Sequence, residues 1–206
     1  MSKLTDARAA VGGLSNPSKM PGRATGLPAP ECKTGSKLVK VSGSVCSDCY
    51  ALKGCYQFPV VQKAQYRRLA ALESPTWAQD MAVAVGRETW FRFHDSGDVQ
   101  SLEHLEKIAE VARLTPNTRH WLPTREKQFV RQYLRKHGDF PANLCVRVSA
   151  AMIDGDAPVG FPNTSTVHAD KPAQGFQCSA PDQGGECRDC RACWDSKIQN
   201  VSYKQH

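Results

Sequence analysis

The fold is decided by residues 89–122, which read TWFRFHDSGDVQSLEHLEKIAEVARLTPNTRHWL. Residues 89–94 and 118–122 are rich in aromatic and β-branched side chains, and this composition predicts two strands. Between them, apolar side chains of residues 100–114 recur at helical spacing, which predicts one amphipathic helix. Strand, helix and strand in this order predict a βα unit, in which the helix carries the chain back so that both strands run parallel.

The pattern continues on the carboxyl side. Residues 125–137 predict a helix that ends at Gly138, and residues 143–149 predict a third strand. A complete (βα) barrel needs about 250 residues, whereas this chain has 206. We therefore expect an α/β fold, namely a compact or partial (βα) TIM-barrel-like parallel barrel with cysteine-rich loops. An open doubly wound sheet is the alternative.

The flanking regions fit a single (βα) domain spanning residues 1–206. An irregular lead-in is expected over residues 1–30, which are rich in Gly, Pro, Ser and Ala. A first cysteine loop follows over residues 31–56, and a C-terminal cysteine segment covers residues 176–195. The other expected elements are a strand over 37–42, helices over 60–73 and 74–85, and strands over 164–168 and 198–203.

The composition predicts a globular protein, with 40% apolar and 23% charged residues. No stretch approaches the roughly 20 apolar residues that a membrane helix needs, and the N-terminus lacks the apolar run of a signal peptide. We therefore expect a cytoplasmic protein with no membrane partner. The formal net charge of +7 permits nucleic-acid binding, but the basic residues are scattered, so a nucleic-acid partner is an open alternative.

Eight of the nine cysteines fall into two groups, one toward each end of the chain. A reducing cytoplasm argues against disulfides, and an odd total would leave one cysteine unpaired. Thiolates are soft ligands that suit iron–sulfur clusters and zinc. Both groups are therefore candidate metal sites: Cys32, Cys46, Cys49 and Cys55 form the first group, and Cys178, Cys187, Cys190 and Cys193 form the second.

The second group has the spacing Cys187-x2-Cys190-x2-Cys193, with Cys178 more distant. Three close thiolates and a remote fourth resemble the bacterial ferredoxin run and favour a [4Fe–4S] cluster. Zinc is the alternative ligand, because structural zinc usually takes two separated Cys-x2-Cys pairs and the first group also contains such a pair.

The first group is less regular. All four thiols could bind one cluster, or three of them could bind a cluster that leaves one iron open to a small-molecule ligand. A third arrangement, in which the two groups share the ligands of a single cluster, also fits the spacing. Cys55 is the least expected ligand, with a free or buried thiol as its other reading. Cys145 lies alone in a predicted strand and is expected to be a core residue. Near the second group, His168 is a spare ligand candidate. Trp194 fits either as a shield of a cluster against water or as a packing residue.

Polar residues gather where the three predicted strands end. They should meet at one edge, because sites in parallel βα folds form at the carboxyl ends of strands. Arg92 and Arg147 interrupt apolar strands and need a partner, for which Asp95, Asp98 or an anionic ligand is expected. The candidate cofactor-binding residues are Arg92, His94, Asp95, Ser96, Asp98, Arg147 and Ser149.

Structural roles for some of these side chains stay open. Asp98 or Ser101 fits as the cap of the following helix, and Thr124 as the cap of the next one. Ordinary helix or surface positions are expected for His104, His120 and His137.

Several motifs stand in order along the chain. They are Cys46-x2-Cys49-Tyr50-Ala51-x-Lys53-Gly54, Arg92-x-His94-x-Ser96-Gly97-Asp98, Val146-Arg147-x-Ser149, Cys187-x2-Cys190-x2-Cys193-Trp194 and Val201-x-Tyr203-x2-His206. This combination resembles the phage "gene product eighty-eight" family over residues 32–206. The resemblance implies a bacteriophage or prophage origin, and hence the host cytoplasm as location.

The strand pattern is also distantly similar to radical S-adenosylmethionine (SAM) enzymes, which place a cubane cluster on a partial (βα) barrel. That resemblance implies SAM as a ligand, with residues 96–98 at its methionine end, and leaves open whether the chain is an enzyme. The first group departs from the Cys-x3-Cys-x2-Cys loop of those enzymes, because it reads Cys32-x13-Cys46-x2-Cys49. We expect an iron–sulfur protein, either redox or structural or radical-SAM-like; the alternative is a zinc-stabilised nucleic-acid-binding or interaction module.

Overall fold

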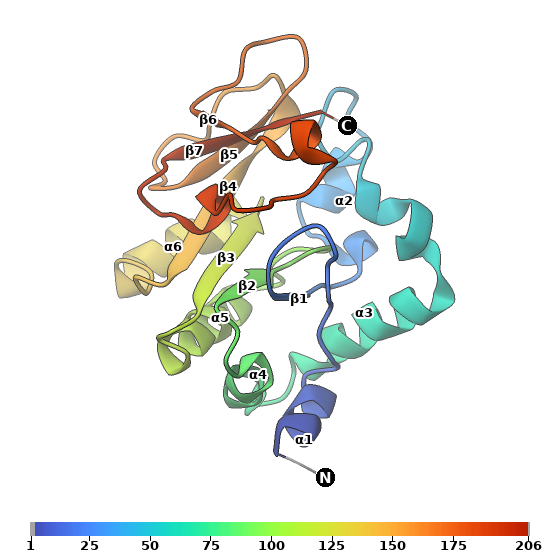
Figure 1. The fold of residues 1–206 in the computed structure, drawn as a ribbon, viewed down its shortest axis with the longest axis vertical. Helices are drawn as coiled ribbons and strands as arrows, with labels where there is room; N and C mark the ends of the chain where they lie inside the picture. Colours follow the sequence, from blue (N-terminus) through green and yellow to red (C-terminus); the bar gives the residue numbers. More distant parts are fainter. Residues whose placement is uncertain (1–2, 206) are drawn as a thin grey trace.

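The computed structural model describes residues 3–205, which form an α/β fold around one sheet (Figure 1). The strand order is β1-β2-β3-β4-β5-β7-β6, and every neighbouring pair runs parallel. Because β1 and β6 are its two edges, the sheet is open rather than closed into a barrel. The strands are Arg23–Thr25 (β1), Trp90–Phe93 (β2), Arg119–Thr124 (β3), Leu144–Ile153 (β4), Thr164–His168 (β5), Phe176–Gln177 (β6) and Asn200–Lys204 (β7).

The predicted βα units are present in the middle of the chain. Two helices connect β2 to β3 and β3 to β4, which confirms the strand–helix–strand–helix–strand order. Among the described residues, no helix is both long and apolar enough to cross a membrane. The α-helices are Lys3–Ala10 (α1), Gly35–Leu38 (α2), Pro59–Ala71 (α3), Trp77–Val85 (α4), Leu102–Leu114 (α5) and Lys127–His137 (α6).

Helices α4, α5 and α6 pack against one face of the sheet and enclose the main apolar core. Side chains alternate across a strand, so Phe91 and Phe93 of β2 point to the same face. They are fully buried together with Leu122 of β3 and Ile108 of α5. Burial of these apolar side chains is the main stabilising contribution on this face.

The ends of these helices follow local sequence signals. Ser101 caps α5, since its Oγ accepts a hydrogen bond from the His104 N–H at 3.1 Å. Asp98 is therefore not the cap. Gly138 ends α6 with a φ of 73°, as predicted, and Glu126 rather than Thr124 is the residue before the first turn of α6.

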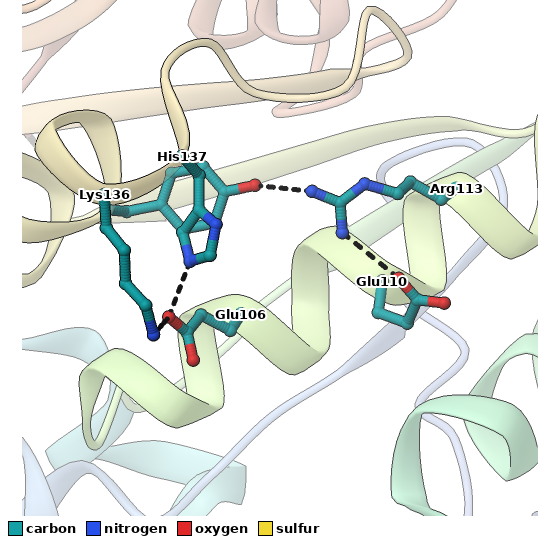
Figure 2. A network of polar contacts seen from close by, with 6 residues as sticks. Glu106, Glu110, Arg113, Lys136 and His137 are labelled. Atoms are coloured by element: carbon teal, nitrogen blue, oxygen red, sulfur yellow. Dashed lines mark hydrogen bonds and ion pairs between the residues drawn. The ribbon is translucent and has the colours of Figure 1, made fainter.

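Helices α5 and α6 are also joined by polar contacts at the surface (Figure 2). Glu106 of α5 accepts from Lys136 Nζ at 2.8 Å and from His137 Nε2 at 2.7 Å, both at the end of α6. Arg113 of α5 donates to the Tyr133 hydroxyl at 3.0 Å. These surface contacts add to the apolar core that already holds the two helices together.

The opposite face of the sheet is covered by the C-terminal cysteine segment, which contains the short strand β6 and short 3-10 turns such as Ala192–Trp194 (η5). Trp121 and Trp194 are buried there with Val201 of β7. The Trp194 indole donates to the Phe91 carbonyl at 3.0 Å, which ties this segment to β2. Figure 1 shows the segment in orange and red, across the sheet from α5 and α6.

Two sequence expectations about the N-terminal part were wrong. The lead-in over residues 1–30 contains α1 and β1 within its described part, and residues 37–42 form the end of α2 and a turn instead of a strand. β1 has only three residues and is stabilised by its pairing with β2. Its own sequence is therefore too short to contain a pattern that predicts a strand. In residues 37–42 the alternation of Lys and Val is a surface pattern, with Lys37, Lys40 and Val41 all exposed.

Candidate functional site

The carboxyl ends of β2 and β3 meet at Asp98. Its carboxylate accepts hydrogen bonds from Thr124 Oγ1 at 2.6 Å, from the Arg125 N–H at 2.8 Å and from the Val99 N–H at 2.7 Å. Burial raises the pKa of Asp98 to about 6, although these hydrogen bonds act in the opposite direction. Asp98 therefore links two strand ends, as expected for residues that follow neighbouring parallel strands.

Glu126 connects this edge of the sheet to the loop of the first cysteine group through hydrogen bonds. It is almost fully buried, and its two carboxylate oxygens accept from the Thr34 N–H at 2.7 Å and from Thr34 Oγ1 at 2.8 Å. Thr34 lies two residues after Cys32. The first cysteine loop is thus fastened to the end of β3 by one buried carboxylate.

Three thiols of the first group are neighbours above this edge. Burial raises the pKa of Cys32 above its usual value, and the nearby Asp98, Cys49 and Cys46 raise it further. The Sγ atoms of Cys32 and Cys46 both lie 3.6 Å from the point that a Cβ on Gly35 would occupy. A side chain at residue 35 would therefore stand against both sulfur atoms.

Cys55 stands outside this set. Its side chain is exposed. It lies close to Tyr56, whose pKa is raised by burial, by Tyr50 and Asp95, and to a smaller extent by Cys55. The sequence ranked Cys55 as the least expected ligand of the group, and the geometry gives three neighbouring thiols and one separate thiol.

The loop after β2 is tightly packed. Ser96 Oγ donates to the Leu27 carbonyl at 2.9 Å and accepts from Gln65 Nε2 at 2.9 Å. Gly97 has a φ of 75°, and a Cβ there would lie 2.6 Å from the Cβ of Leu27. Glycine is therefore required by both conformation and space, and Ser96 is fixed by its two partners.

His94 and Asp95 carry buried polar atoms without hydrogen-bond partners in the described structure. Both ring nitrogens of His94 and Oδ1 of Asp95 belong to this class, as does Nε of Arg125. The His94 ring packs 5.3 Å from the ring of His104. Burial, with a contribution from Arg92, lowers the pKa of His94 to about 3, so its imidazole is neutral. Buried polar atoms usually have partners, so these atoms mark a place where a ligand could supply them.

Arg92 does not form the ion pair with Asp95 or Asp98 that its position predicted. Its guanidinium donates to the His94 carbonyl at 3.1 Å and to the Tyr50 hydroxyl at 3.3 Å, and it lies over the Trp121 ring at 4.5 Å. The partners of the Arg92 guanidinium are therefore a main-chain carbonyl, the Tyr50 hydroxyl and the face of the Trp121 ring, and none of these is a carboxylate.

Arg147 also lacks the predicted carboxylate. It is fully buried, and all its N–H groups point to main-chain carbonyls. Three acceptors lie in the cysteine segment and three at the adjoining strands: Cys193, Ala192, Asp195, Thr164, Ile198 and Gln199, at 2.7 to 3.4 Å. Arg147 therefore positions the C-terminal cysteine segment on β4 and β5.

The four thiols of the second group are neighbours on this face. Burial raises the pKa of Cys187, and the nearby Cys178 and Cys190 thiols raise it further. Burial raises the pKa of Cys193 to about 12, with Cys178 and Cys187 again among the causes. Cys178, Cys190 and Cys193 thus pack in one hydrophobic cluster although they come from two segments.

Polar and aromatic groups surround these sulfurs. Tyr203 Oη lies 3.2 Å from Cys193 Sγ, and a backbone N–H of Ala180 is bonded to Cys178. Trp194 packs against Trp121 at 5.1 Å between ring centroids. A surface pocket reaches Cys190; its lining is Phe176, Ser179, Cys190, Arg191, Ala192, Asp195 and Ile198.

Neither group is a ready-made metal centre. Within residues 3–205, no three or more His, Cys, Asp or Glu side chains have a geometry that would hold a metal ion. All nine cysteines are free thiols. The donor set of each group, four cysteine thiols, suits a soft metal.

The remaining candidates are distributed over the fold. Ser149 shares a hydrogen bond of 3.0 Å with Ser165 Oγ on the face that carries Arg147. Cys145 is buried, and burial raises its pKa to about 11 beside Arg147 and Asp195. His104 and His120 are buried rather than ordinary surface residues, which corrects that expectation. His206 lies outside the described residues.

Some residues that shape these sites were not among the sequence candidates. Glu126 and Tyr203 contact the two cysteine groups or their loops, and Tyr50 contacts Arg92 and the Asp95 carbonyl. Glu126 follows a predicted strand, so its position did give a signal. Tyr50 and Tyr203 belong to the motifs of the family resemblance, but their contacts were not predicted because their partners are distant in sequence.

A second pocket lies at the other end of the sheet and contains none of these residues. It is lined by Gln79, Ala82, Val83, Gly86, Leu114, Thr115, Pro116, Asn117 and Thr118. These residues surround the amino end of β3, whereas the candidate residues lie at carboxyl ends or on the sheet face.

Comparison with known proteins gives a family for the whole site. The model of the family described as "Gene product 88" matches residues 2–196, which include both cysteine groups and all the strand-end candidates. No curated protein and no solved structure matches the chain. The comparisons therefore give no support to the distant similarity to radical SAM enzymes. The match covers nearly all of the chain, and the chain belongs to the gene product 88 family.

Proposed function

We propose that the chain is an iron–sulfur protein in which Cys178, Cys187, Cys190 and Cys193 hold one [4Fe–4S] cluster. The observation that carries the proposal is that Cys178, Cys190 and Cys193, which come from two separate segments, pack in one hydrophobic cluster with Trp121 and Trp194, and that Cys187 is close enough to influence the pKa of Cys193. Four cysteine sulfurs are the usual ligand set of such a cluster. When bound, the cluster would supply one-electron transfer or structural stabilisation.

The neighbouring residues suit this role. Arg147 fixes the segment that carries Cys193 through its bonds to main-chain carbonyls. The Tyr203 hydroxyl and a backbone N–H donate toward two of the sulfurs, and hydrogen bonds to cluster sulfurs tune the reduction potential. The buried tryptophans Trp121 and Trp194 exclude water from the inner side.

A radical-SAM-like role for the first group is the second candidate. The observation that favours it is the grouping of three thiols, Cys32, Cys46 and Cys49, without Cys55. Three protein ligands would leave one iron open for a small molecule, with SAM as the expected ligand. In this proposal the open sheet is a partial (βα) barrel, and the unpartnered atoms of His94 and Asp95 face part of the ligand pocket.

The proposal includes a setting. A bacteriophage or prophage gene product of this kind would act in the host cytoplasm, where a reducing environment keeps thiolates available for metal. Zinc in the cysteine groups, with a nucleic-acid-binding or interaction role, is the competing assignment.

Anaerobic purification followed by iron, sulfide and zinc analysis tests the proposal. We expect a brown protein with about four irons and four sulfides for one loaded group, and about eight of each if both groups are loaded. A colourless protein with stoichiometric zinc would overturn the iron–sulfur assignment and establish the zinc alternative.

Matched cysteine variants then locate the metal. Cys190→Ser should lose about four irons per chain, whereas Cys55→Ser, which changes an exposed and separate thiol, should keep the full content. Cys46→Ser should lose iron only if the first group is loaded. Equal iron in the Cys190→Ser and wild-type proteins would contradict the ligand assignment. The SAM proposal is tested separately, by the change that added SAM makes in the EPR spectrum of the reduced protein.

A further inference from the structure

Most of the net positive charge lies in one segment of the chain. Residues 32–72 contain seven basic residues and a single acidic one, Asp48, while the whole chain has a net charge of +7. Asp48 pairs with Lys53 at the surface. The net positive charge is therefore concentrated in this segment rather than spread evenly along the chain.

Aromatic side chains are exposed in the same segment. Tyr50, Phe58 and Tyr66 have 55%, 59% and 47% of their surface exposed. Aromatic side chains of folded proteins are usually more buried than this. They alternate along the chain with the exposed cations Lys53, Lys63 and Arg67.

Helix α3 carries the later members of these exposed aromatic and basic residues. Lys63, Tyr66 and Arg67 are exposed at spacings of three and four residues, so they share one side of the helix. Phe58 precedes the first turn, about 12 Å along the axis from Tyr66. The buried side of α3 contributes Gln65 and Arg68. Figure 1 shows α3 on the side of the molecule opposite α6.

The earlier members, Tyr50 and Lys53, lie in and between two turns that precede this helix. The 3-10 turn Gly54–Gln57 (η3) contacts both α3 and the turn Tyr50–Leu52 (η2). The rings of Tyr50 and Tyr56 meet edge to face at 5.6 Å. The two turns and α3 are therefore neighbours, and we name their exposed aromatic and basic side chains the α3 platform: Tyr50, Lys53, Phe58, Lys63, Tyr66 and Arg67.

We propose that the α3 platform binds single-stranded nucleic acid. Positive side chains along a path attract the phosphate backbone, and exposed aromatic rings between them stack on bases. A single strand is favoured over a duplex because stacking needs unpaired base faces. The platform contains none of the cysteines proposed as cluster ligands.

Fluorescence anisotropy of the full chain with fluorescein-labelled (dT)20 and (rU)20 tests the proposal, with a 20-base-pair duplex for comparison. We expect binding to a single strand that weakens linearly on a log–log plot against salt. The two single-stranded probes distinguish DNA from RNA. The duplex should bind more weakly at the same salt concentration.

Matched variants separate stacking from charge. Phe58→Leu keeps an apolar side chain but removes the ring, and it should weaken binding about tenfold; Phe58→Trp should restore it. Lys63→Ala should weaken binding and reduce the salt slope, while Arg135→Ala on α6, an exposed cation outside the platform, should change neither.

Three results would overturn the proposal. They are the absence of binding to both single strands at low salt, equal affinity for the duplex, and unchanged affinity in Phe58→Leu. Binding to anionic phospholipid vesicles without binding to either oligonucleotide would also overturn it and assign the platform to a membrane surface.

Discussion

The two faces of the sheet are stabilised in different ways. On one face, α4, α5 and α6 bury a continuous apolar core that includes Phe91 and Ile108. On the other, an irregular cysteine segment is held by the hydrogen bonds of Arg147 and by a few tryptophans. A segment without helices leaves its main-chain carbonyls unpaired, so it needs specific donors when it is buried. The helical face tolerates change by repacking, whereas the cysteine face depends on single contacts.

The strongest test of this difference is Arg147→Met. The variant removes every hydrogen bond of a fully buried guanidinium and leaves several carbonyls without donors. We expect the free energy of unfolding to fall by at least about 4 kcal/mol. Urea denaturation measures the change. Arg131→Met, which loses only a contact with the Phe161 ring, should cost under about 1 kcal/mol. Similar losses for the two variants would show that Arg147 does not hold the cysteine face.

Ile108→Ala breaks the helical face instead. Ile108 is fully buried in the apolar core, so removing its side chain should cost about 3 kcal/mol. Iron per folded chain should stay at the wild-type value, because the cysteine segment lies on the other side of the sheet. Val159→Ala, at an 87% exposed residue, is the control and should be neutral. Loss of iron in Ile108→Ala would mean that the two faces are not independent.

Lowering the pH should weaken the helical face through its buried histidines. Burial lowers the pKa of His120 to about 4, below the value near 6.5 in the unfolded chain. As pH falls from 6.5 to 4, the unfolded chain takes up a proton that the folded chain does not, so stability is lost. The cost is about 2 kcal/mol at pH 5.

The His120→Gln variant tests this pH dependence. It cannot titrate, and its amide can still reach Thr115, the partner of the His120 Nε2 atom at 2.8 Å. Urea denaturation at pH 7 and at pH 5 should show a smaller difference for the variant than for the wild type. An equal difference would assign the acid sensitivity to other groups, such as His94 and His104.

The smallest expected effect is at the surface contacts of Figure 2. The hydrogen bonds from Lys136 and His137 lower the pKa of Glu106, but these groups are well exposed to solvent. Glu106→Gln should cost about 0.5 kcal/mol and less at high salt. A double-mutant cycle with Lys136→Met measures the coupling. A coupling above about 1 kcal/mol would mean that this contact is stronger than an ordinary surface ion pair.

The sequence predicted the helical side of the fold well. Residues 89–149 carry strong periodic patterns, and β2, α5, β3, α6 and β4 all appear where they were expected. β1 and β6 were missed because they are only two or three residues long and form through pairing with distant strands. Partners that lie far away in the chain leave no local pattern.

The candidate site was predicted as residue types rather than as contacts. The cysteine spacing pointed to residues that lie near other cysteines in the fold. The strand-end position of Asp98 pointed to a residue that lies near the first cysteine group. The partners of Arg92 and Arg147 were wrong, because main-chain carbonyls of remote segments satisfy them. A sequence shows that a buried cation needs a partner, but it does not show that the main chain will supply one.

The position of β7 has a consequence for synthesis on the ribosome. β7 lies between β5 and β6, so neither strand has its final neighbour until residues 200–204 have emerged. The helical layer and the first cysteine loop are complete by residue 153 and can fold much earlier. During translation the chain therefore passes through a stage in which half the sheet is formed and the second cysteine group is still unassembled. A nascent chain arrested before residue 200 would lack Tyr203, whose hydroxyl lies 3.2 Å from Cys193 Sγ, and the second cysteine group would therefore be incomplete.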